Sequence, residues 1–417
     1  MPFPDVDQQI RVLRQGVEQI LTEEELREKL ERSRRENRPL RVKQGFDPTA
    51  PDIHLGHTVG IQILKRFQDL GHQVVLIVGD TTALVGDPSG RSKTRPRLTR
   101  EEILSNAATY QDQFFKILDR SKTEVRFNGE WFANMRIEKL IELAATFTVS
   151  RILERDDFHK RFLEEIPIGL HEFLYPLLQG YDSVEIRSDV EIGATEQTFN
   201  LLAARDLQKA HGQEPQVAMT CPVLPGTDGV RRMSKSLGNY IGVTEEPEQM
   251  FGKAMSIPDT LLESWTRLAS RWEEEELKAA LAEVASGSDP MGAKTKLATR
   301  LVTLYHGEEA ARRASAHFDR VVRRKDVPAE IEELEISPWG ERLGLGRLLK
   351  ETGLVPSTSE ARRLVEAGAV TVDGTKVTNP QDEIEAEPGR AYLLKVGKRS
   401  YLRVKIGAKG SAKASSS

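Results

Sequence analysis

Residues 40–78, LRVKQGFDPTAPDIHLGHTVGIQILKRFQDLGHQVVLIV, decide the fold. Residues 40–46 favour a short strand, which the turn-forming pair Asp47-Pro48 closes. A helix is predicted over about 56–70. The β-branched run VVLIV at 74–78 is typical of a strand buried in a parallel sheet. Strand, helix and strand at this spacing form a βαβ unit, so we predict a doubly wound α/β domain.

The segments outside this unit show other patterns. Residues 1–38 are predicted to be helical, with Thr22 capping the acidic run TEEELREKLE. The chain becomes helical and charged from about 245 to 325. The stretch that follows, with Pro328, Pro338 and several glycines, favours a linker, which we place at 331–341. Two short helices and a β-rich end follow, where Asp373-Gly374 predicts a two-residue hairpin.

Composition narrows the class of protein. A single cysteine, Cys221, excludes an internal disulfide and a cysteine-rich metal site, and it favours the reducing cytosol. No apolar run is long enough for a membrane span, and the first residues lack a signal-peptide pattern, so we expect a cytoplasmic protein.

Charge is unevenly distributed along the chain. Residues 342–409 hold 13 Lys and Arg against 8 Asp and Glu, so this segment carries +5 and the rest −9, for −4 overall. A basic module on an acidic body favours contact with a polyanion, although charged runs are more often solvated surface.

The motif His54-Leu55-Gly56-His57 lies where strand gives way to helix. Histidines three apart share one face of the first turn, where free N–H groups and the helix dipole favour an anion. Gly56 has no side chain, so a base or ribose could approach the backbone. The alternatives are a structural helix start and a zinc pair, and the absence of a third ligand nearby speaks against zinc.

The second motif is RRMSKSLGN, residues 231–239, which follows the turn-rich CPVLPGTDG. A mobile loop is expected there. Cationic and hydroxyl groups on such a loop can close over departing pyrophosphate, although a solvated basic turn is the alternative. The two motifs in this order within one α/β chain are far more specific than either one.

HLGH with MSKS resembles the class I aminoacyl-tRNA synthetases, and nearly the whole chain resembles the bacterial tyrosyl-tRNA synthetases. The further segments that carry this resemblance are GFDPTAPDIHLGH, VGDTTALVGDPSGRSKTR, LHEFLYPLLQGYDSVE and LGRLLKETGLVPSTSEARRLVEAGAVTVDG. The resemblance implies ATP-dependent activation of tyrosine, with Mg²⁺ accompanying ATP, and transfer of tyrosine to tRNA(Tyr). It also implies a homodimer.

The resemblance divides the chain into parts. They are an N-terminal helical segment (1–38), a Rossmann-type catalytic domain (39–228), the KMSKS loop with a helical anticodon-binding domain (229–330), a linker (331–341), a small α+β RNA-binding domain of the ribosomal-protein-S-four type (342–406) and a disordered tail (407–417). In the RNA-binding domain, Arg362 and Arg363 would contact phosphates. A small solubilising domain is the alternative.

The tyrosine pocket is expected on YPLLQGYD. Its Tyr175, Gln179 and Asp182 share one helical face, which could instead be a polar stripe. In the resemblance Tyr175 and Gln179 hold the ammonium group, and Asp182 accepts a hydrogen bond from the phenol. The remaining residues implied near tyrosine are Thr82, Asp87, Asn128 and Gln197.

ATP chemistry in this family needs positioning and positive charge rather than an enzyme nucleophile. The residues that the resemblance assigns to the phosphates and to catalysis are Thr49, His54, His57, Arg91, Arg95, Arg232 and Lys235. Those assigned to the rest of ATP are Gly56, Gly193, Glu196, Met233, Ser234 and Ser236. No metal-ligating residues are predicted.

Three segments depart from the family pattern. Arg232 replaces the first lysine of KMSKS, which keeps the charge but changes its shape. Lys43 stands where many bacterial relatives have a tyrosine that touches the substrate phenol, although a lysine there fits one bacterial subgroup. Gly193-Ala194-Thr195-Glu196-Gln197 replaces GGTDQ, and this segment normally contacts the ribose of the adenylate.

Several other functions fit parts of the pattern. One is a paralogue that makes an aminoacyl-adenylate for another amino acid or acceptor, which the departure at 193–197 favours and the set on YPLLQGYD opposes. The related tryptophan enzyme generally lacks the C-terminal module. An RNA-binding regulator built on an inactive synthetase would be expected to lose the histidines or Lys235, and a generic HxGH nucleotidyltransferase would lack the two RNA-binding domains.

Overall fold

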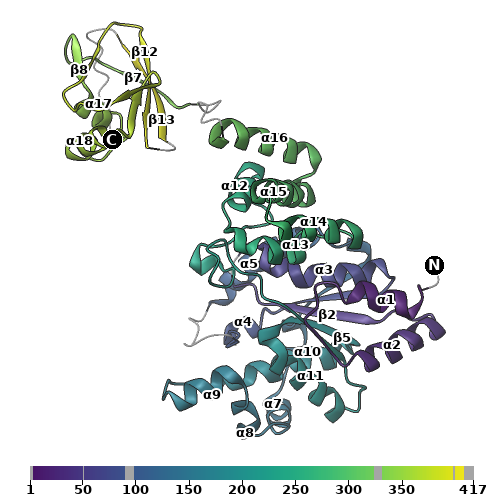
Figure 1. Ribbon diagram of the computed structural model, residues 1–417. Coiled ribbons are helices and arrows are strands. Elements are labelled where there is room, and N and C mark those ends of the chain that lie inside the picture. Colours follow the sequence, from purple (N-terminus) through teal and green to yellow (C-terminus); the bar gives the residue numbers. More distant parts are fainter. Residues whose placement is uncertain (1–2, 50, 90–97, 324–330, 398–399, 408–417) are drawn as a thin grey trace. The chain divides into compact units, whose positions relative to one another are not determined.

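The computed structural model describes residues 3–49, 51–89, 98–323, 331–397 and 400–407. The chain divides into two compact units, Met1–Ser315 and Ala316–Ser417, whose helices and strands are labelled in Figure 1.

A mixed sheet forms the centre of the first unit. Its strand order is β1-β6-β5-β2-β3-β4, with β1 antiparallel to β6 and all other neighbours parallel. Within the described residues its strands are β1 (Gln19–Leu21), β2 (Arg41–Phe46), β3 (Gln73–Val78), β4 (Thr123–Phe127), β5 (Val190–Ala194) and β6 (Val217–Cys221). The chain leads from β2 outward to β4 and then returns to β5 on the other side of β2. This reversal is that of a doubly wound sheet, and the predicted fold class is confirmed.

The βαβ unit at 40–78 is present as predicted. Helix α3 (Leu55–Asp69) connects the parallel strands β2 and β3, and Val74, Leu76 and Val78 of β3 are buried. Helix α3 covers one face of the sheet, whereas α10 (Tyr175–Ile186) and α11 (Thr198–Ala210) cover the other (Figure 1). The carboxyl ends of β2 and β5 therefore lie side by side, with α3 on one face of the sheet and α10 and α11 on the other.

Further helices complete the first unit. Between β3 and α10 the chain forms α4 (Thr82–Val85), α5 (Arg100–Phe114), α6 (Gly129–Phe132), α7 (Ile137–Ala144), α8 (Val149–Leu153) and α9 (Asp156–Leu163). The helical region predicted after residue 245 contains α12 (Pro247–Met255), α13 (Leu262–Ala269), α14 (Glu274–Ser286), α15 (Pro290–His306) and α16 (Glu308–Phe318).

The prediction that residues 1–38 are helical throughout is wrong in one place. Strand β1 separates α1 (Val6–Leu13) from α2 (Glu23–Glu36). The chain turns at Gly16, whose φ is 73°, and the next residues pair with the edge strand β6. The predicted cap is confirmed, because Thr22 Oγ1 accepts a hydrogen bond from the N–H of Glu25 at 3.2 Å.

The second unit combines two short helices with β-strands. A sheet of order β10-β9-β12-β13-β7 lies beside the pair β11-β8. Within the described residues the elements are β7 (Glu333–Ile336), β8 (Arg342–Gly344), α17 (Leu345–Glu351), α18 (Thr358–Glu366), β9 (Val370–Val372), β10 (Thr375–Val377), β11 (Glu383–Glu385), β12 (Ala391–Val396) and β13 (Ser400–Ile406). The predicted hairpin joins β9 and β10, with Asp373 and Gly374 at φ 49° and 80°.

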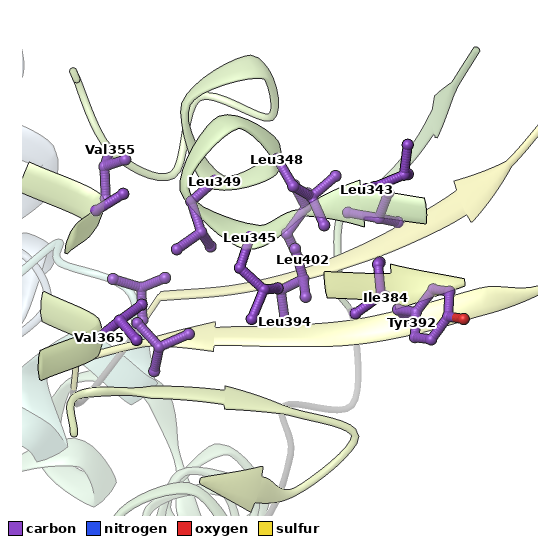
Figure 2. Close-up of a cluster of buried hydrophobic side chains, with 14 of the residues drawn as sticks. Leu343, Leu345, Leu348, Leu349, Val355, Val365, Ile384, Tyr392, Leu394 and Leu402 are labelled. Atoms are coloured by element: carbon purple, nitrogen blue, oxygen red, sulfur yellow. The ribbon is translucent and has the colours of Figure 1, made fainter. Parts of the chain in front are cut away.

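The core of this unit lies between α17 and the sheet. Figure 2 shows Leu345 of α17 beside Leu394 of β12 and Leu402 of β13. The predicted linker at 331–341 needs correction, because it contains β7, which runs parallel to β13. Leu334 and Ile336 alternate with glutamates and pack against this core, so the pattern of a strand outweighs the nearby prolines.

Candidate functional site

A cavity of about 540 Å³ opens at the carboxyl ends of the parallel strands. Its walls include Phe46 at the end of β2, Gly79 after β3, and Gly193 and Ala194 at the end of β5. This is where the strand order reverses, which is the usual ligand site of a doubly wound sheet.

Most of the predicted site residues line this cavity. They are Thr49, His54, Gly56, His57, Thr82, Asp87, Tyr175, Gln179, Asp182, Gly193, Glu196, Gln197, Arg232, Met233, Ser234 and Lys235. Asn128 lies behind two of them. Arg91 and Arg95 fall outside the described residues, and so does the side chain of Ser236.

The two histidines lie at the N-terminus of α3 with their rings stacked, 3.8 Å between centroids. The backbone N–H of His54 donates to Nδ1 of His57 at 3.3 Å, so the proton of a neutral His57 sits on Nε2. Burial, the neighbouring His57 and Lys235 lower the pKa of His54 to about 2, and burial and Lys235 lower that of His57 to about 4. Both rings are therefore neutral at pH 7 and can serve phosphates as hydrogen-bonding groups rather than as charges.

Gly56 allows the second motif to approach α3. A Cβ at this position would meet the His54 ring at 3.0 Å and Cβ of Met233 at 3.5 Å. The N–H of Gly56 lies 3.3 Å from Sδ of Met233. The group that approaches Gly56 closely is thus Met233 of the same chain. This contact brings the two motifs together, although the two residues lie 177 positions apart in the sequence.

Lys235 supplies positive charge beside the histidines. Its Nζ lies 3.2 Å from a carboxylate oxygen of Asp52. Burial lowers the pKa of Lys235, and Asp52 opposes that shift. The loop is tied down by Asn239, whose Oδ1 accepts from the N–H of Ser234 at 2.8 Å and whose Nδ2 donates to the carbonyl of Arg232 at 3.1 Å.

Two of the departures from the family pattern contact each other. Arg232 Nη1 donates to Glu196 Oε2 at 2.7 Å, and both side chains are about one-third exposed. Because the arginine is on the loop and the glutamate follows β5, this ion pair bridges the two sides of the cavity.

The three polar residues of YPLLQGYD lie on α10, as predicted, and line one wall. The hydroxyl of Tyr175 donates to Asp47 Oδ2 at 2.9 Å. Gln179 Nε2 donates to Glu191 Oε1 at 3.1 Å, and its Oε1 accepts from Asn200 at 2.9 Å. The alternative of a water-facing stripe is excluded, because these side chains face the cavity and its polar supports.

Asp182 is buried at the same wall. Its carboxylate accepts hydrogen bonds from Trp131 Nε1 at 3.0 Å and from Asn128 Nδ2 at 3.4 Å. Burial raises its pKa to about 7, although Lys43 and the two donors oppose the shift. Asn128 also donates to Thr82 Oγ1 at 3.1 Å, so it aligns two lining residues.

A further polar cluster surrounds Asp87. Gln197 Nε2 donates to Asp87 Oδ2 at 2.7 Å and to Ser89 Oγ at 3.0 Å. The N–H of Ser89 donates to Asp87 Oδ1 at 2.9 Å, and Arg155 lies 3.7 Å from the same oxygen. Asp87 is therefore held as an oriented carboxylate that faces the cavity.

Sequence reasoning missed several residues. Asp47 lines the cavity and accepts from Thr82 Oγ1 at 2.7 Å as well as from Tyr175, and Asp52 lines the mouth. An acid directly after a strand at the switch point was the available signal for Asp47. Lys43 and Glu191 lie behind the cavity as a buried ion pair, and neither position had a local pattern that predicted this pairing.

The predicted RNA-binding arginines lie on α18 of the second unit. Each is exposed and paired within its own helix, Arg362 with Glu366 at 2.9 Å and Arg363 with Glu360 at 2.5 Å. Exposed pairs of this kind contribute little to stability, so a phosphate can displace the glutamates at low cost.

None of the helices in the described ranges combines the length and apolar composition needed to cross a membrane. The described residues likewise contain no group of three or more His, Cys, Asp or Glu side chains that could hold a metal ion.

Comparisons with protein families match both units. Residues 35–323 match the family model of the class I tRNA synthetases (W and Y), and residues 344–387 match that of the S4 domain. The tyrosine–tRNA ligase of Moorella thermoacetica is 52% identical over 401 residues, 96% of either chain. That of Haemophilus influenzae is 50% identical over 402 residues, 96% of this chain and 98% of the other.

Solved structures show the same fold at low identity. A tyrosyl-tRNA synthetase from Archaeoglobus fulgidus, complexed with L-tyrosine, is 22% identical with a TM-score of 0.60, covering 75% of this chain and all of the other. A C-terminally truncated mitochondrial tyrosyl-tRNA synthetase from Aspergillus nidulans is 20% identical with a TM-score of 0.61, covering 76% and 94%.

Proposed function

Because the chain belongs to the class I tRNA synthetases of the tryptophan and tyrosine type, we propose that it is a tyrosine–tRNA ligase. It activates L-tyrosine with ATP to give tyrosyl-adenylate and pyrophosphate. It then transfers tyrosine to the 3′ end of tRNA(Tyr), with release of AMP.

One observation carries this function. A single cavity brings a wall suited to an amino acid, formed by α10, opposite a wall suited to a triphosphate, formed by the start of α3 and the loop at 232–235. A reaction that joins a carboxylate to the α-phosphate of ATP needs these two walls to face each other.

The amino-acid wall supports tyrosine as the substrate. Tyr175 and Asp87 would orient the ammonium group together with Oε1 of Gln179. The buried carboxylate of Asp182 would accept a hydrogen bond from the phenol. A substrate without the hydroxyl would leave that carboxylate without its partner in a buried place, and this favours tyrosine over phenylalanine.

The phosphate wall supports in-line attack of the tyrosine carboxylate on the α-phosphate. Thr49 and the neutral His54 and His57 would donate hydrogen bonds to phosphate oxygens. Lys235 and Arg232 would place positive charge where it builds up on leaving pyrophosphate. Arg91 and Arg95, which lie outside the described residues, would add further positive charge.

The nucleoside end of ATP would lie along the strand ends at the switch point. Gly56, Gly193 and Met233 line that part of the cavity. Glu196 would accept hydrogen bonds from the ribose, and its carboxylate also accepts one from Arg232. Ser234 and Ser236 of the same loop would also bind ATP.

Mg²⁺ would accompany ATP. The donor set of the described residues fits an ion held mainly by phosphates, because Mg²⁺ at such sites commonly takes only one or two protein carboxylates. Asp47 and Asp52 are the carboxylates at the cavity that could contribute.

Contact with tRNA would involve both units. We assign the helical region within 229–330 to anticodon binding and the S4-type domain to phosphate contacts through Arg362 and Arg363. The protein would act in the cytoplasm, where tRNA is charged.

We also propose that it acts as a homodimer. Exposed large apolar side chains are concentrated in one stretch of the first unit, at Ile137, Ile141, Val149, Phe162, Leu163 and Leu170. A surface of this kind favours association.

Tyrosine-dependent exchange between ATP and labelled pyrophosphate tests the activity directly. Tyrosine should support exchange, and tryptophan and phenylalanine should not at equal concentration. Exchange with tryptophan alone, or with neither aromatic amino acid, would refute the assignment to tyrosine.

A further inference from the structure

We propose that Lys43 and Glu191, an ion pair buried behind the cavity, position the side chains that hold the substrate tyrosine. This role presupposes the tyrosine–tRNA ligase activity proposed above. Neither residue lines the cavity, so each acts through another residue rather than on the substrate.

The pair lies at the switch point of the sheet. Lys43 of β2 and Glu191 of β5 are register partners on adjacent parallel strands, with Nζ and Oε1 3.0 Å apart. Their side chains are 0% and 1% exposed. A charged pair at this depth is costly to desolvate and persists only with further hydrogen bonds.

Helix α10 supplies these hydrogen bonds. Lys43 Nζ donates to the carbonyl of Gln179 at 2.9 Å and to Oγ of Ser183 at 2.8 Å, which with Glu191 uses all three ammonium protons. Glu191 Oε2 accepts from Ser183 Oγ at 3.0 Å and from Gln216. The pair therefore fixes α10 to the sheet at the turn that carries the amino-acid wall.

The pair also sets the orientation of one substrate-binding amide. Gln179 Nε2 donates to Glu191, so the amide must present Oε1 on its other side, where Asn200 already donates to it. A carbonyl oxygen has two lone pairs, and the second can accept a hydrogen bond from the ammonium group of tyrosine. The reversed amide would present N–H groups to a cation.

The charges act on Asp182 as well, from two strands. Lys43 on β2 favours its ionised form and Glu191 on β5 opposes it, while Trp131 and Asn128 donate hydrogen bonds to it. Because the two charges have opposite effects, removing each one should move the pKa of Asp182 in opposite directions.

The first test is steady-state pyrophosphate exchange with the full-length Lys43→Met/Glu191→Gln variant, which leaves no uncompensated charge. The KM for tyrosine should rise about tenfold, the size expected for one lost charge-assisted contact, and the KM for ATP should stay within about twofold. A control is Lys29→Met/Glu214→Gln, an ion pair at 3.1 Å whose lysine is 2% and whose glutamate is 53% exposed, and which does not line the cavity. This control should leave both constants unchanged.

The second test is the pH dependence of kcat/KM for tyrosine. Lys43→Met should move its midpoint to higher pH and Glu191→Gln to lower pH, which a merely structural pair would not do. Ser183→Ala removes the hydroxyl that bridges both residues and keeps their charges. It should raise the tyrosine KM in the same direction by less, and it serves if the charge variants do not fold.

Equal increases in the KM for tyrosine and for ATP, or midpoints that do not move apart, would overturn the positioning role. So would unchanged constants in a folded double variant or in Ser183→Ala. A wild-type chain without tyrosine-dependent exchange would overturn the proposed function and this role together, whereas an active wild type with unaffected variants would overturn this role alone.

Discussion

Asp182 shows how strongly its surroundings can shift the pKa of a side chain. It is enclosed by α10 and by two donors, so burial brings its pKa to about 7, several units above that of a free carboxyl group. The charge of this residue therefore changes within the ordinary working range of an enzyme. His54 and His57, with pKa values of about 2 and about 4, stay neutral over the same range.

We expect kcat/KM for tyrosine to fall as pH decreases. The phenol donates to ionised Asp182, so binding favours the deprotonated form, and acid removes the acceptor. With a pKa of about 7, the loss between about pH 8 and about pH 6 should approach tenfold. Exchange assays across this range would measure it. Asp182→Asn should abolish the dependence, and a dependence that persists in this variant would assign the titration to another group.

Lys235→Ala should slow adenylate formation by about 100-fold, as for loss of one contact to a developing charge, and leave tyrosine affinity nearly unchanged. Lys235 pairs with Asp52 at the mouth of the cavity, and its proposed partner is pyrophosphate rather than the tyrosine bound at the α10 wall. Pre-steady-state kinetics would separate the two effects. Lys253→Ala is a control, since Lys253 pairs with Glu245 at 2.6 Å and does not line the cavity. Weaker tyrosine binding with a normal activation rate would contradict this role.

At the scale of elements, local periodicity was enough to predict β2, α3 and β3, because the buried strand and the helix each have a clear repeat. It missed β1 and β7, which are three and four residues long. Their strand pairing depends on β6 and β13, which lie far along the chain. The motif residues were predicted through their resemblance to a family. The pairing of Lys43 with Glu191 was not, because only the assembled sheet brings these residues together.

The contact between the loop and the end of β5 gives a prediction about coupling. Arg232→Gln and Glu196→Gln should each raise the KM for ATP, and the double variant should be no worse than the poorer single variant. The interaction energy should be about 0.5–1 kcal/mol, since both side chains are partly exposed. A double-mutant cycle in exchange assays would measure it, with Arg231→Gln as a control on the same loop. Strictly additive effects would show that the ion pair has no role in ATP binding.

At the scale of the whole molecule, the chain contains two units with separate cores. All the catalytic residues proposed here that the structure describes belong to the first unit, whereas the basic segment 342–409 belongs to the second. Because β7 pairs with β13, the second unit begins before residue 333 rather than at the end of the predicted linker.

A chain that ends at residue 323 should keep pyrophosphate exchange and lose most tRNA charging. In the intact enzyme, charging should weaken as salt rises, because phosphate contacts release counterions. A chain that ends at residue 341 should aggregate, since β7 would expose Leu334 and Ile336 without β13. Parallel exchange, charging and light-scattering measurements would test the three forms. Undiminished charging by the shorter chain would remove the RNA role of the second unit.

The pairing of β1 with β6 has a consequence for synthesis on the ribosome. Gln19 lies opposite Thr220, so β1 cannot pair with β6 until about 200 further residues have been synthesised. At roughly 5–20 residues per second, that interval lasts about 10–40 s. During that time β1 has no strand to pair with, and the amphipathic helices α1 and α2 present apolar faces that chaperones can bind. Residues 19–21 therefore leave the ribosome about 200 residues before the strand that secures them in the sheet.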